Sequence, residues 1–509
     1  MGNIAVKMQG ITKRFGQVTA NRNVNMEIYK GEILSLLGEN GSGKTTLMNM
    51  LSGIYHPDEG EIYIDEKLVR IESPRDAFDL GIGMVHQHFK LVDVLTAAEN
   101  IILGLPGKLD IKAAKEKIQE ICDKYGFDVD PDKKIYNMSV SEKQTVEIVK
   151  VLYRGANILI LDEPTAVLTP QETEKLFAVM RNMKKDGKSI IIITHKLNEV
   201  QEISDRVAIL RAGEYIGVLI TKDTNTQEMT DMMVGHSVVL NIDRPEPKDP
   251  KTRIKVNGLT IKDAEGIEKI KNVSFTMNSG EILGIAGISG CGQKELLEAI
   301  AGLQPVVDGS IKYVEDDGSE VEVIGMDPTD IQKLGVSLSF VPEDRLGMGL
   351  VANMDISENM MLRSYRSGKG FVTDRKKPRE TAKQIVDLLE VKTPGLDTPV
   401  RRLSGGNVQK VLVGREISSN PKVLMTAYAV RGLDINSSYM IYDLINSQKT
   451  NGVAVLFVGE DLDVLLQISD RILVLCDGQV SGMLDGRKAD KKEVGLLMTS
   501  LQGGASNER

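Results

Sequence analysis

The chain has 509 residues, which is enough for about three domains of ordinary size. Its net charge of −9 and its 4% aromatic content, with no tryptophan, argue against a bare nucleic-acid binder and against an aromatic-lined sugar or base-stacking site. With 41% hydrophobic and 27% charged residues, the composition is that of a globular protein and excludes a mostly disordered chain.

No segment predicts a membrane element. The N-terminus, MGNIAVKMQG, lacks the charged start and apolar core of a signal peptide, and no stretch approaches the roughly 18 apolar residues that span a bilayer. The three cysteines, Cys122, Cys291 and Cys476, have no metal-ligand spacing. We expect reduced thiols in a cytosolic protein, buried as small hydrophobic side chains.

A glycine-rich turn follows the apolar run GEILSLL, and the next segment, TTLMNMLSG, has apolar residues at helical spacing. The turn fits GxxxxGK[ST], in which glycines let backbone N–H groups approach phosphates at the positive end of the following helix. Lys44 is expected to reach the β- and γ-phosphates, and the Thr45 hydroxyl to ligate Mg²⁺. The alternative is a turn that binds nothing. The predicted phosphate-binding residues are Gly38, Glu39, Asn40, Gly41, Ser42, Gly43, Lys44, Thr45 and Thr46.

Further polar residues follow other short apolar runs. Gln87 comes just after GIGMV, and the region from about Leu95 to Gly155 then has a helical pattern. The run NILILD ends in Asp162 and Glu163. Asp162 can hold the Mg²⁺ shell and Glu163 can activate the attacking water, although an acidic pair at a helix start is the alternative.

His195 ends the apolar run SIIIIT, at the ligand edge expected for a parallel sheet. A structural histidine is the alternative. The β-branched runs and helical stretches together predict an α/β core with an inserted helical subdomain.

The second half of the chain repeats the first. GEILSLLGENGSGKTTLMNMLSG, starting at Gly31, returns 249 positions later as GEILGIAGISGCGQKELLEAIAG, and two later segments return at an offset of 265. We therefore expect domains over 1–238 and 252–499, a polar, proline-bearing linker over 239–251, and a tail over 500–509.

On these residues the chain resembles the ATP-binding subunits of ABC importers, in two copies that cover its whole length. The resemblance rests on the phosphate loop at 38–45, Gln87, LILDEP at Leu159–Pro164, His195, and LSGGN at Leu403–Asn407. It implies two tandem P-loop ATPase domains, each with a parallel-sheet core, an antiparallel β part and a helical subdomain, packed head to tail within one chain. It also implies that Phe15 stacks on adenine, that Gln87 contacts Mg²⁺ and senses a membrane partner, and that His195 contacts the γ-phosphate.

In the family each ATP lies between the phosphate loop of one unit and the LSGGQ-type segment of the other. Here that segment is a second helix N-terminus, which supplies γ-phosphate contacts from Ser404, Gly405, Gly406 and Asn407. The first copy instead reads MSVSE, where Ser141 replaces the second glycine and should crowd the phosphate.

The second copy has lost the catalytic residues of the first. By the repeat offsets, the equivalents of Phe15, Lys44, Thr45, Asp162, Glu163 and His195 are Ala264, Gln293, Lys294, Ala427, Tyr428 and Glu460. Gln87 aligns with Glu343, in the segment FVPEDR. The competent phosphate loop would thus meet the intact LSGGN, and the degraded loop would meet the degraded MSVSE. We expect one hydrolytic site and one inactive or nucleotide-holding site.

The run VHQHFKLVDVLTAAENIILG looks most like the nucleoside-uptake branch of the monosaccharide and nucleoside importers. The chain departs from that branch at Ser141 and at TAYAV, residues 426–430, which puts nucleotide retention at the second site in doubt. The resemblance implies ATP and Mg²⁺ as cofactors, two membrane-spanning permease subunits, an extracellular solute-binding protein that acts indirectly, and a place on the cytoplasmic face of the membrane.

Several alternatives stay open. They are a sugar importer ATPase of the same group, a soluble tandem ATPase acting on ribosomes or DNA, a regulatory protein that binds nucleotide without hydrolysis, and a small-molecule kinase. We expect no nucleic-acid partner, because the second site is lost and the linker is short.

Overall fold

The computed structural model describes residues 3–87, 89–105, 110–166, 168–237, 241–263, 265–288, 290–340, 346, 349–362, 365, 374–418, 421–459 and 461–500. The chain forms two compact units, Met1–Val239 and Leu240–Arg509. No helix in the described part of the chain is long and apolar enough to cross a membrane.

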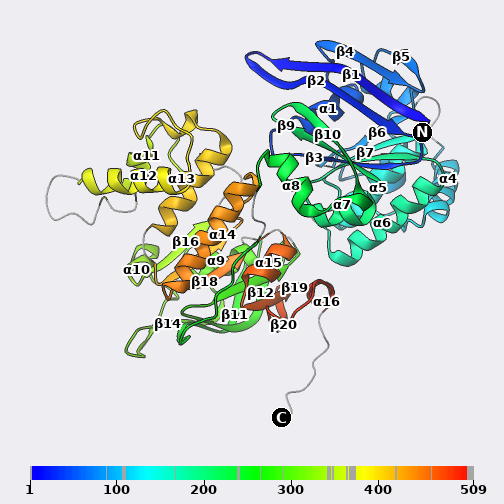
Figure 1. The fold of residues 1–509 in the computed structure, drawn as a ribbon. Helices are drawn as coiled ribbons and strands as arrows, with labels where there is room; N and C mark the ends of the chain where they lie inside the picture. The colour runs from blue at the N-terminus through cyan, green and yellow to red at the C-terminus, as the bar shows by residue number, and fades with distance from the viewer. Residues whose placement is uncertain are drawn as a thin grey trace. The chain divides into compact units, whose positions relative to one another are not determined.

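The first unit combines two sheets with helices (Figure 1). Its strands are β1 (Ile4–Phe15), β2 (Val18–Tyr29), β3 (Ile33–Leu37), β4 (Glu59–Ile64), β5 (Lys67–Val69), β6 (Ile82–Val85), β7 (Ile158–Asp162), β8 (Ser189–Ile193), β9 (Arg206–Arg211) and β10 (Glu214–Ile220). Its helices are α1 (Lys44–Leu51), α2 (Pro74–Asp79), α3 (Ala97–Ile102), α4 (Ile111–Tyr125), α5 (Val140–Tyr153), α6 (Pro170–Lys185), α7 (Leu197–Ile203) and α8 (Thr226–Val234).

The second unit repeats these elements in the same order. Its strands are β11 (Thr252–Lys262), β12 (Glu268–Asn278), β13 (Ile282–Gly287), β14 (Asp308–Val314), β15 (Glu320–Glu322), β16 (Val336–Phe340), β17 (Val423–Ala427), β18 (Ala454–Val458), β19 (Arg471–Cys476) and β20 (Gln479–Asp485). Its helices are α9 (Gln293–Ile300), α10 (Pro328–Lys333), α11 (Ile356–Met361), α12 (Lys376–Leu388), α13 (Gly405–Ile417), α14 (Ile435–Thr450), α15 (Leu462–Ile468) and α16 (Lys491–Thr499).

Both units have the same sheet topology. An antiparallel sheet of order β2-β1-β4-β5 accompanies a six-stranded sheet of order β10-β9-β3-β8-β7-β6, and the second unit has the equivalent orders β12-β11-β14-β15 and β20-β19-β13-β18-β17-β16. Only the terminal hairpins, β9–β10 and β19–β20, are antiparallel in the large sheets. The predicted fold class, α/β with a parallel core and an antiparallel part, is confirmed.

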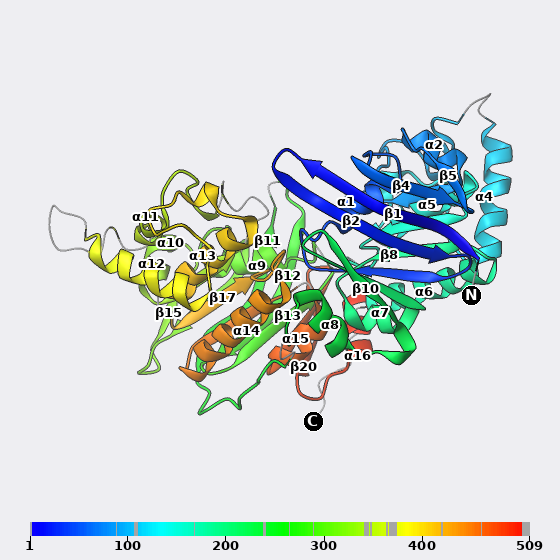
Figure 2. The ribbon, with the colours of Figure 1, turned by 45° about the horizontal axis from the view of Figure 1, so that its top comes forward.

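The strand sequences explain the buried core. Every residue of β3, β7 and β8 is buried, because a parallel sheet covered on both faces needs apolar side chains on both sides. The two faces of this sheet pack into separate clusters, with Leu34 and Ile160 in one and Ile33 and Leu161 in the other. In the first unit β1, β2 and β4 form a layer of their own, as both views show (Figures 1 and 2).

The helical subdomains occupy the predicted place between the sixth and seventh strands. In the first unit α3, α4 and α5 pack together through Ile101, Ile118 and Val146. In the second unit α11, α12 and α13 lie together to one side of the sheet (Figure 2). Capping boxes at Thr96, Ser139 and Asp355 begin three of these helices, each with a glutamate three residues later.

The predicted linker residues are anchored to the second unit. Arg244 donates from Nη1 to the carbonyl oxygens of Ser469 at 2.7 Å and Gly486 at 2.9 Å. Ile242 is buried, and Asn446 donates to the Asp243 carbonyl oxygen at 2.5 Å. The polar composition of 239–251 hides this anchoring, because Arg244 bonds to backbone groups that no sequence pattern marks.

Candidate nucleotide site

The phosphate loop of the first unit connects β3 to α1, so its backbone N–H groups lie at a helix N-terminus. Gly41 and Gly43 have φ angles of 80° and 93°, which side-chain-bearing residues rarely adopt. A Cβ atom on Gly43 would lie 2.3 Å from the carbonyl oxygen of Ala20. Backbone conformation therefore favours glycine at both positions, and close packing also requires it at Gly43.

The ammonium group of Lys44 bonds to two backbone carbonyl groups of its own loop. Its Nζ donates to the carbonyl oxygens of Gly38 at 2.6 Å and Glu39 at 2.9 Å, and the residue is 8% exposed. Burial lowers the pKa of this ammonium, which the carboxylates of Glu163 and Asp162 partly offset. A phosphate that bonds to the Lys44 ammonium in place of the two carbonyl oxygens would meet a positive charge that is already desolvated and held in position.

The loop also contains a hydroxyl group that lacks a hydrogen-bond partner in the described part of the chain. The Ser42 hydroxyl is buried and has no hydrogen-bond partner among the described residues. Asn40, Gly41 and Thr45 are exposed, while Glu39 and Thr46 are half-buried. An orphaned donor inside a ring of backbone N–H groups is what a phosphate would satisfy.

Thr45 and Asp162 bring two oxygen donors together. The Thr45 hydroxyl donates to Oδ2 of Asp162, the last residue of β7, over 3.4 Å. Burial and the neighbouring charge of Glu163 raise the pKa of Asp162 to about 6. Mg²⁺ prefers one or two such protein oxygens together with phosphate oxygens and water, so these residues fit the ion.

Glu163 lies where three strand ends meet. Its Oε2 accepts a 2.8 Å hydrogen bond from Gln87 beyond β6, and its Oε1 lies 3.1 Å from Nδ1 of His195 beyond β8. A carboxylate only accepts hydrogen bonds, so Nδ1 of His195 carries the proton. The bond to His195 is the main reason that the pKa of Glu163 lies below its usual value. The carboxylate thus stays ionised, as a base that orients water must.

The backbone at Glu163 is strained, with φ at 48°. Its N–H donates to the Ile193 carbonyl oxygen over 2.9 Å. Tyr428, the equivalent residue of the second unit, has φ at 57° and donates in the same way to Val458 over 2.9 Å. The fold therefore imposes this backbone conformation, because the second unit keeps it with a tyrosine in place of the glutamate.

The aromatic residue expected to stack on adenine has a partner that sequence reasoning missed. Phe15 is 44% exposed at the end of β1, and its ring makes a T-shaped contact with the Tyr55 ring at a centroid distance of 5.2 Å. Lys13 lies 5.6 Å above the Phe15 ring. No sequence signal joins Phe15 to Tyr55, because only the pairing of β1 with β4 brings their segments together.

The described glycines of the second phosphate loop keep the backbone conformation of the first, but glutamine replaces the buried lysine. Gly290 and Gly292 have φ angles of 88° and 95°, and Gln293 donates from Nε2 to the Ile288 carbonyl oxygen over 3.1 Å. Lys294 stands where Thr45 supplies its hydroxyl, and Ala427 ends β17 where Asp162 ends β7. This loop therefore does not fit Mg²⁺, and it has no phosphate-binding lysine at the position of Lys44. The other equivalents, Ala264, Glu343 and Glu460, lie outside the described residues.

The two LSGGQ-type segments begin equivalent helices. Ser404 caps α13, where its side chain accepts from the Asn407 backbone and from Asn407 Nδ2 at 2.8 Å. Ser404 and Gly405 are exposed, and Gly406 is half-buried. In the first unit Ser139 forms a capping box with Glu142, and Val140 follows it with 39% exposure. Among the described residues of these two helix starts, glycines therefore stand in the second unit where Val140 and Ser141 carry side chains in the first.

In each unit a side chain of the helical subdomain donates a hydrogen bond to the loop after the sixth strand. Lys150 of α5 donates to the Lys90 carbonyl oxygen at 3.1 Å, and Glu147 accepts from the Lys90 N–H at 2.9 Å. The second unit repeats the first bond from Arg415 to the Gly349 carbonyl oxygen at 3.0 Å. This loop carries Gln87 in the first unit, so Gln87 is linked mechanically to α5.

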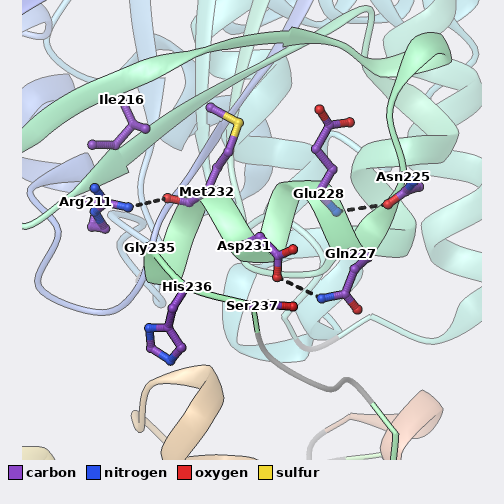
Figure 3. Close-up of a pocket in the computed structure, with 10 residues that line it drawn as sticks. All are labelled: Arg211, Ile216, Asn225, Gln227, Glu228, Asp231, Met232, Gly235, His236 and Ser237. Carbon is purple, nitrogen blue, oxygen red and sulfur yellow. Dashed lines mark hydrogen bonds between the residues drawn. The ribbon is translucent and has the colours of Figure 1, made fainter.

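An open hollow of about 550 Å³ beside α8 is separate from this site (Figure 3). Arg211 donates there to the Met232 carbonyl oxygen at 3.2 Å, and Gln227 donates to Asp231 at 2.8 Å. None of the predicted site residues lines it. Asn225 caps the start of α8 by accepting from the Glu228 N–H at 2.9 Å, and Arg211 bonds near its end, so these polar groups serve the helix itself.

The three cysteines are free thiols. Cys122 is buried, as the sequence predicts, but Cys291 and Cys476 are only half-buried. The difference arises because Cys291 lies in the second phosphate loop and Cys476 ends β19 beside it.

Comparison with known proteins identifies the family of the chain. The model of the ABC transporter family matches residues 21–166 and 270–426. The nucleoside import ATP-binding protein NupA of Lactococcus lactis is 44% identical over 99% of both chains, and the guanosine import ATP-binding protein NupO of Bacillus subtilis is 42% identical over 99% of both. The glucose import ATP-binding protein TsgD13 of Haloferax volcanii is 39% identical over 97% of this chain and 95% of its own. The chain is a tandem ATP-binding ATPase that belongs to the ABC transporter family.

Proposed function

We propose that this ATPase powers the import of a nucleoside through separate membrane-spanning permease subunits. The single observation that carries the ATPase chemistry is the convergence of Gln87 and His195 on Glu163. The nucleoside reading rests on the names of the two relatives at 44% and 42% identity. Sugar import is the second candidate, which the Haloferax volcanii relative favours at 39% identity.

In the proposed reaction the first phosphate loop binds ATP, with Lys44 on the β- and γ-phosphates and Phe15 on the base. Thr45, Asp162 and Gln87 would hold Mg²⁺, which would neutralise charge that develops on the transferred phosphoryl group. Glu163 orients water for in-line attack, and the proton on Nδ1 of His195 keeps that carboxylate in place. His195 also contacts the γ-phosphate.

We further propose that the site is completed in trans within one chain. Ser404, Gly405, Gly406 and Asn407 contact the γ-phosphate bound at the first loop. The positions of the lost residues support this pairing. The second unit has Gln293 and Ala427 in place of the phosphate-binding lysine and the metal-binding aspartate, yet it keeps LSGGN intact, as expected if LSGGN serves the phosphate loop of the first unit. The second loop would then face Ser139 and Ser141 and hold no hydrolysable Mg²⁺–ATP.

We propose that the permeases dock where the helical subdomain meets the sheet, so that the chain lies on the cytoplasmic face of the membrane. In the second unit a hollow of about 340 Å³ is lined by residues of α9, α10, β16 and α13. The buried ion pair Arg415–Glu416, at 2.7 Å, forms part of its lining and ties α13 to Gly349. The bond from Lys150 to Lys90 supports the same coupling route toward Gln87 in the first unit. Two permeases and an extracellular solute-binding protein complete the proposed importer.

The test is ATP hydrolysis by the chain reconstituted in vesicles with its permeases and solute-binding protein. A nucleoside should stimulate hydrolysis and uptake, whereas glucose and ribose should not. Glu163→Gln is the control, since it should abolish both signals. Stimulation by a sugar alone would favour the second candidate, and rRNA or DNA that co-purifies and stimulates the chain would overturn the importer assignment.

A further inference from the structure

Beside Glu163 and His195, three other side chains bond the same two segments together. Lys196 follows His195 directly, and its Nζ donates to the Thr165 carbonyl oxygen over 2.9 Å. The same Nζ lies 3.1 Å from Oε1 of Glu199. The Thr165 hydroxyl donates to the other oxygen of that carboxylate. Thr165, Lys196 and Glu199 therefore form a closed triad.

The triad is well shielded from water. Thr165 is 2% exposed, and the side chains of Lys196 and Glu199 are 23% and 12% exposed. Charge-assisted hydrogen bonds that are shielded in this way hold geometry better than pairs on an open surface.

The position of the triad relates it to hydrolysis. Thr165 lies two residues after Glu163, and Lys196 lies one residue after His195. The Glu163–His195 contact is thus bounded on one side by the backbone bond from Glu163 to Ile193 and on the other by the bond from Lys196 to Thr165. A shift of either segment would change the 3.1 Å contact between the two catalytic side chains.

Lys196 stands where helix electrostatics disfavour a cation. It is the N-cap residue of α7 and makes no side-chain cap hydrogen bond. A helix N-terminus favours an acid or a polar acceptor, and the second unit has Asp461 there, whose side chain accepts from the Asp463 N–H at 2.8 Å. The first unit therefore has a lysine at a position where a side-chain cap would stabilise the helix more.

The unit that has lost the catalytic carboxylate has lost the triad as well. The equivalents of Thr165, Lys196 and Glu199 are Val430, Asp461 and Val464. Val430 and Val464 pack against the apolar core of the second unit. Apolar packing is thus sufficient for the fold at these positions, so the fold alone does not require the polar triad.

We propose that Thr165, Lys196 and Glu199 are positioning residues for hydrolysis, which hold the segment after Glu163 against the segment that carries His195. This inference rests on the proposed roles of Glu163 and His195. It goes beyond them because none of the three residues needs to touch ATP, Mg²⁺ or water.

The test compares Lys196→Asp, Lys196→Arg and wild type in the full chain with its permeases. Lys196→Asp supplies the missing cap but places a second carboxylate beside Glu199, so the melting temperature should fall by no more than about 4–8 °C, the shift that about 1 kcal/mol produces in a small domain. Because misplaced catalytic groups cost up to about 100-fold, kcat should fall roughly 10- to 100-fold while the KM for ATP changes little. Lys196→Arg should restore most of kcat, since a guanidinium can still reach Thr165 and Glu199.

A second variant tests whether kcat falls because the triad is broken or because the new aspartate adds a negative charge. Glu199→Gln keeps the size of the side chain and an acceptor for Thr165 but removes its charge, so it should lower kcat in the same direction with an unchanged KM. Val464→Ala is the matched control in the second unit, and it should leave kcat unchanged.

The outcomes separate this inference from the proposed function. If Lys196→Asp and Glu199→Gln hydrolyse ATP at the wild-type rate while Glu163→Gln is inactive, the triad has no positioning role. A parallel loss of melting temperature and kcat that Lys196→Arg does not rescue would assign the triad to folding alone. Full activity of Glu163→Gln would instead overturn the proposed site.

Discussion

Nε2 of Gln87 donates a 2.8 Å hydrogen bond to Oε2 of Glu163. This bond joins the residue proposed as the water-activating base to a loop that α5 holds through Lys90. A permease that moves the helical subdomain would therefore act on Glu163 through a short chain of bonded residues.

Glu163→Gln should abolish hydrolysis and retain ATP binding. The amide cannot accept a proton from water, and loss of a general base costs roughly 10²- to 10⁴-fold in kcat. Lys44 and the phosphate loop are unchanged, so the dissociation constant for ATP should stay within about threefold of wild type, inside the usual spread of such effects. The measurement is steady-state hydrolysis beside equilibrium binding of labelled ATP. Full turnover by the variant would assign the base to another residue.

Phe15→Ala should raise the KM for ATP more than it lowers kcat. Stacking of a base on an aromatic ring contributes about 1–3 kcal/mol, which corresponds to a roughly 5- to 150-fold change in affinity. Tyr55→Ala should have a smaller effect in the same direction, because the Tyr55 ring only packs against the Phe15 ring. Tyr55→Phe, which keeps the ring, should match wild type. An unchanged KM in Phe15→Ala would show that adenine binds elsewhere.

The site proposed in trans predicts unequal effects of two substitutions. Gly406→Ser should lower kcat by roughly 10- to 100-fold, because the new side chain would crowd the donors that face the γ-phosphate. The fold itself tolerates the change, since a Cβ at Gly406 would meet only Leu433, at 3.6 Å. Ser141→Gly is the matched change in the first unit and should leave kcat unaltered. Equal effects of the two substitutions would contradict the proposed pairing.

Thiol chemistry should separate Cys122 from the other two cysteines. Burial raises the pKa of Cys122 to about 11, so its thiol stays protonated at pH 8.5, where an unperturbed thiol is about half ionised. Because the fold favours the protonated thiol, this group contributes to the stability of the folded chain. The contribution is fully present below the pKa that Cys122 has in the unfolded chain, and it is lost as the pH rises through 11. Mass spectrometry after iodoacetamide treatment at pH 8.5 should find Cys122 unlabelled in the native chain and labelled in urea. Native labelling of Cys122 as fast as of Cys291 would contradict this packing.

The sequence predicts the parts of the site that are contiguous in the chain. The loop at 38–45 and the strand that ends in Asp162 are local patterns, and the parallel strands place Gln87, Glu163 and His195 at one edge because their strand ends are neighbours. The internal repeat also allows each position to be compared with its counterpart, which identifies Gln293 and Tyr428 as departures.

Contacts between distant segments could not be predicted in this way. The Phe15–Tyr55 pair depends on the pairing of β1 with β4, and the triad at Thr165 depends on where α7 begins. The anchoring of Arg244 depends on backbone carbonyl groups, which carry no sequence signal. Each of these features is set by tertiary packing of residues that look ordinary in the sequence.

If one working site serves the whole chain, two lysine-position variants should behave differently. The measurement is steady-state hydrolysis and the number of nucleotides bound per chain in Lys44→Ala and Gln293→Ala, side by side. We expect Lys44→Ala to lose hydrolysis and one bound nucleotide, and Gln293→Ala to hydrolyse ATP like wild type. Equal loss of hydrolysis in both variants would make the second loop a true partner in catalysis and would contradict the asymmetry between the units.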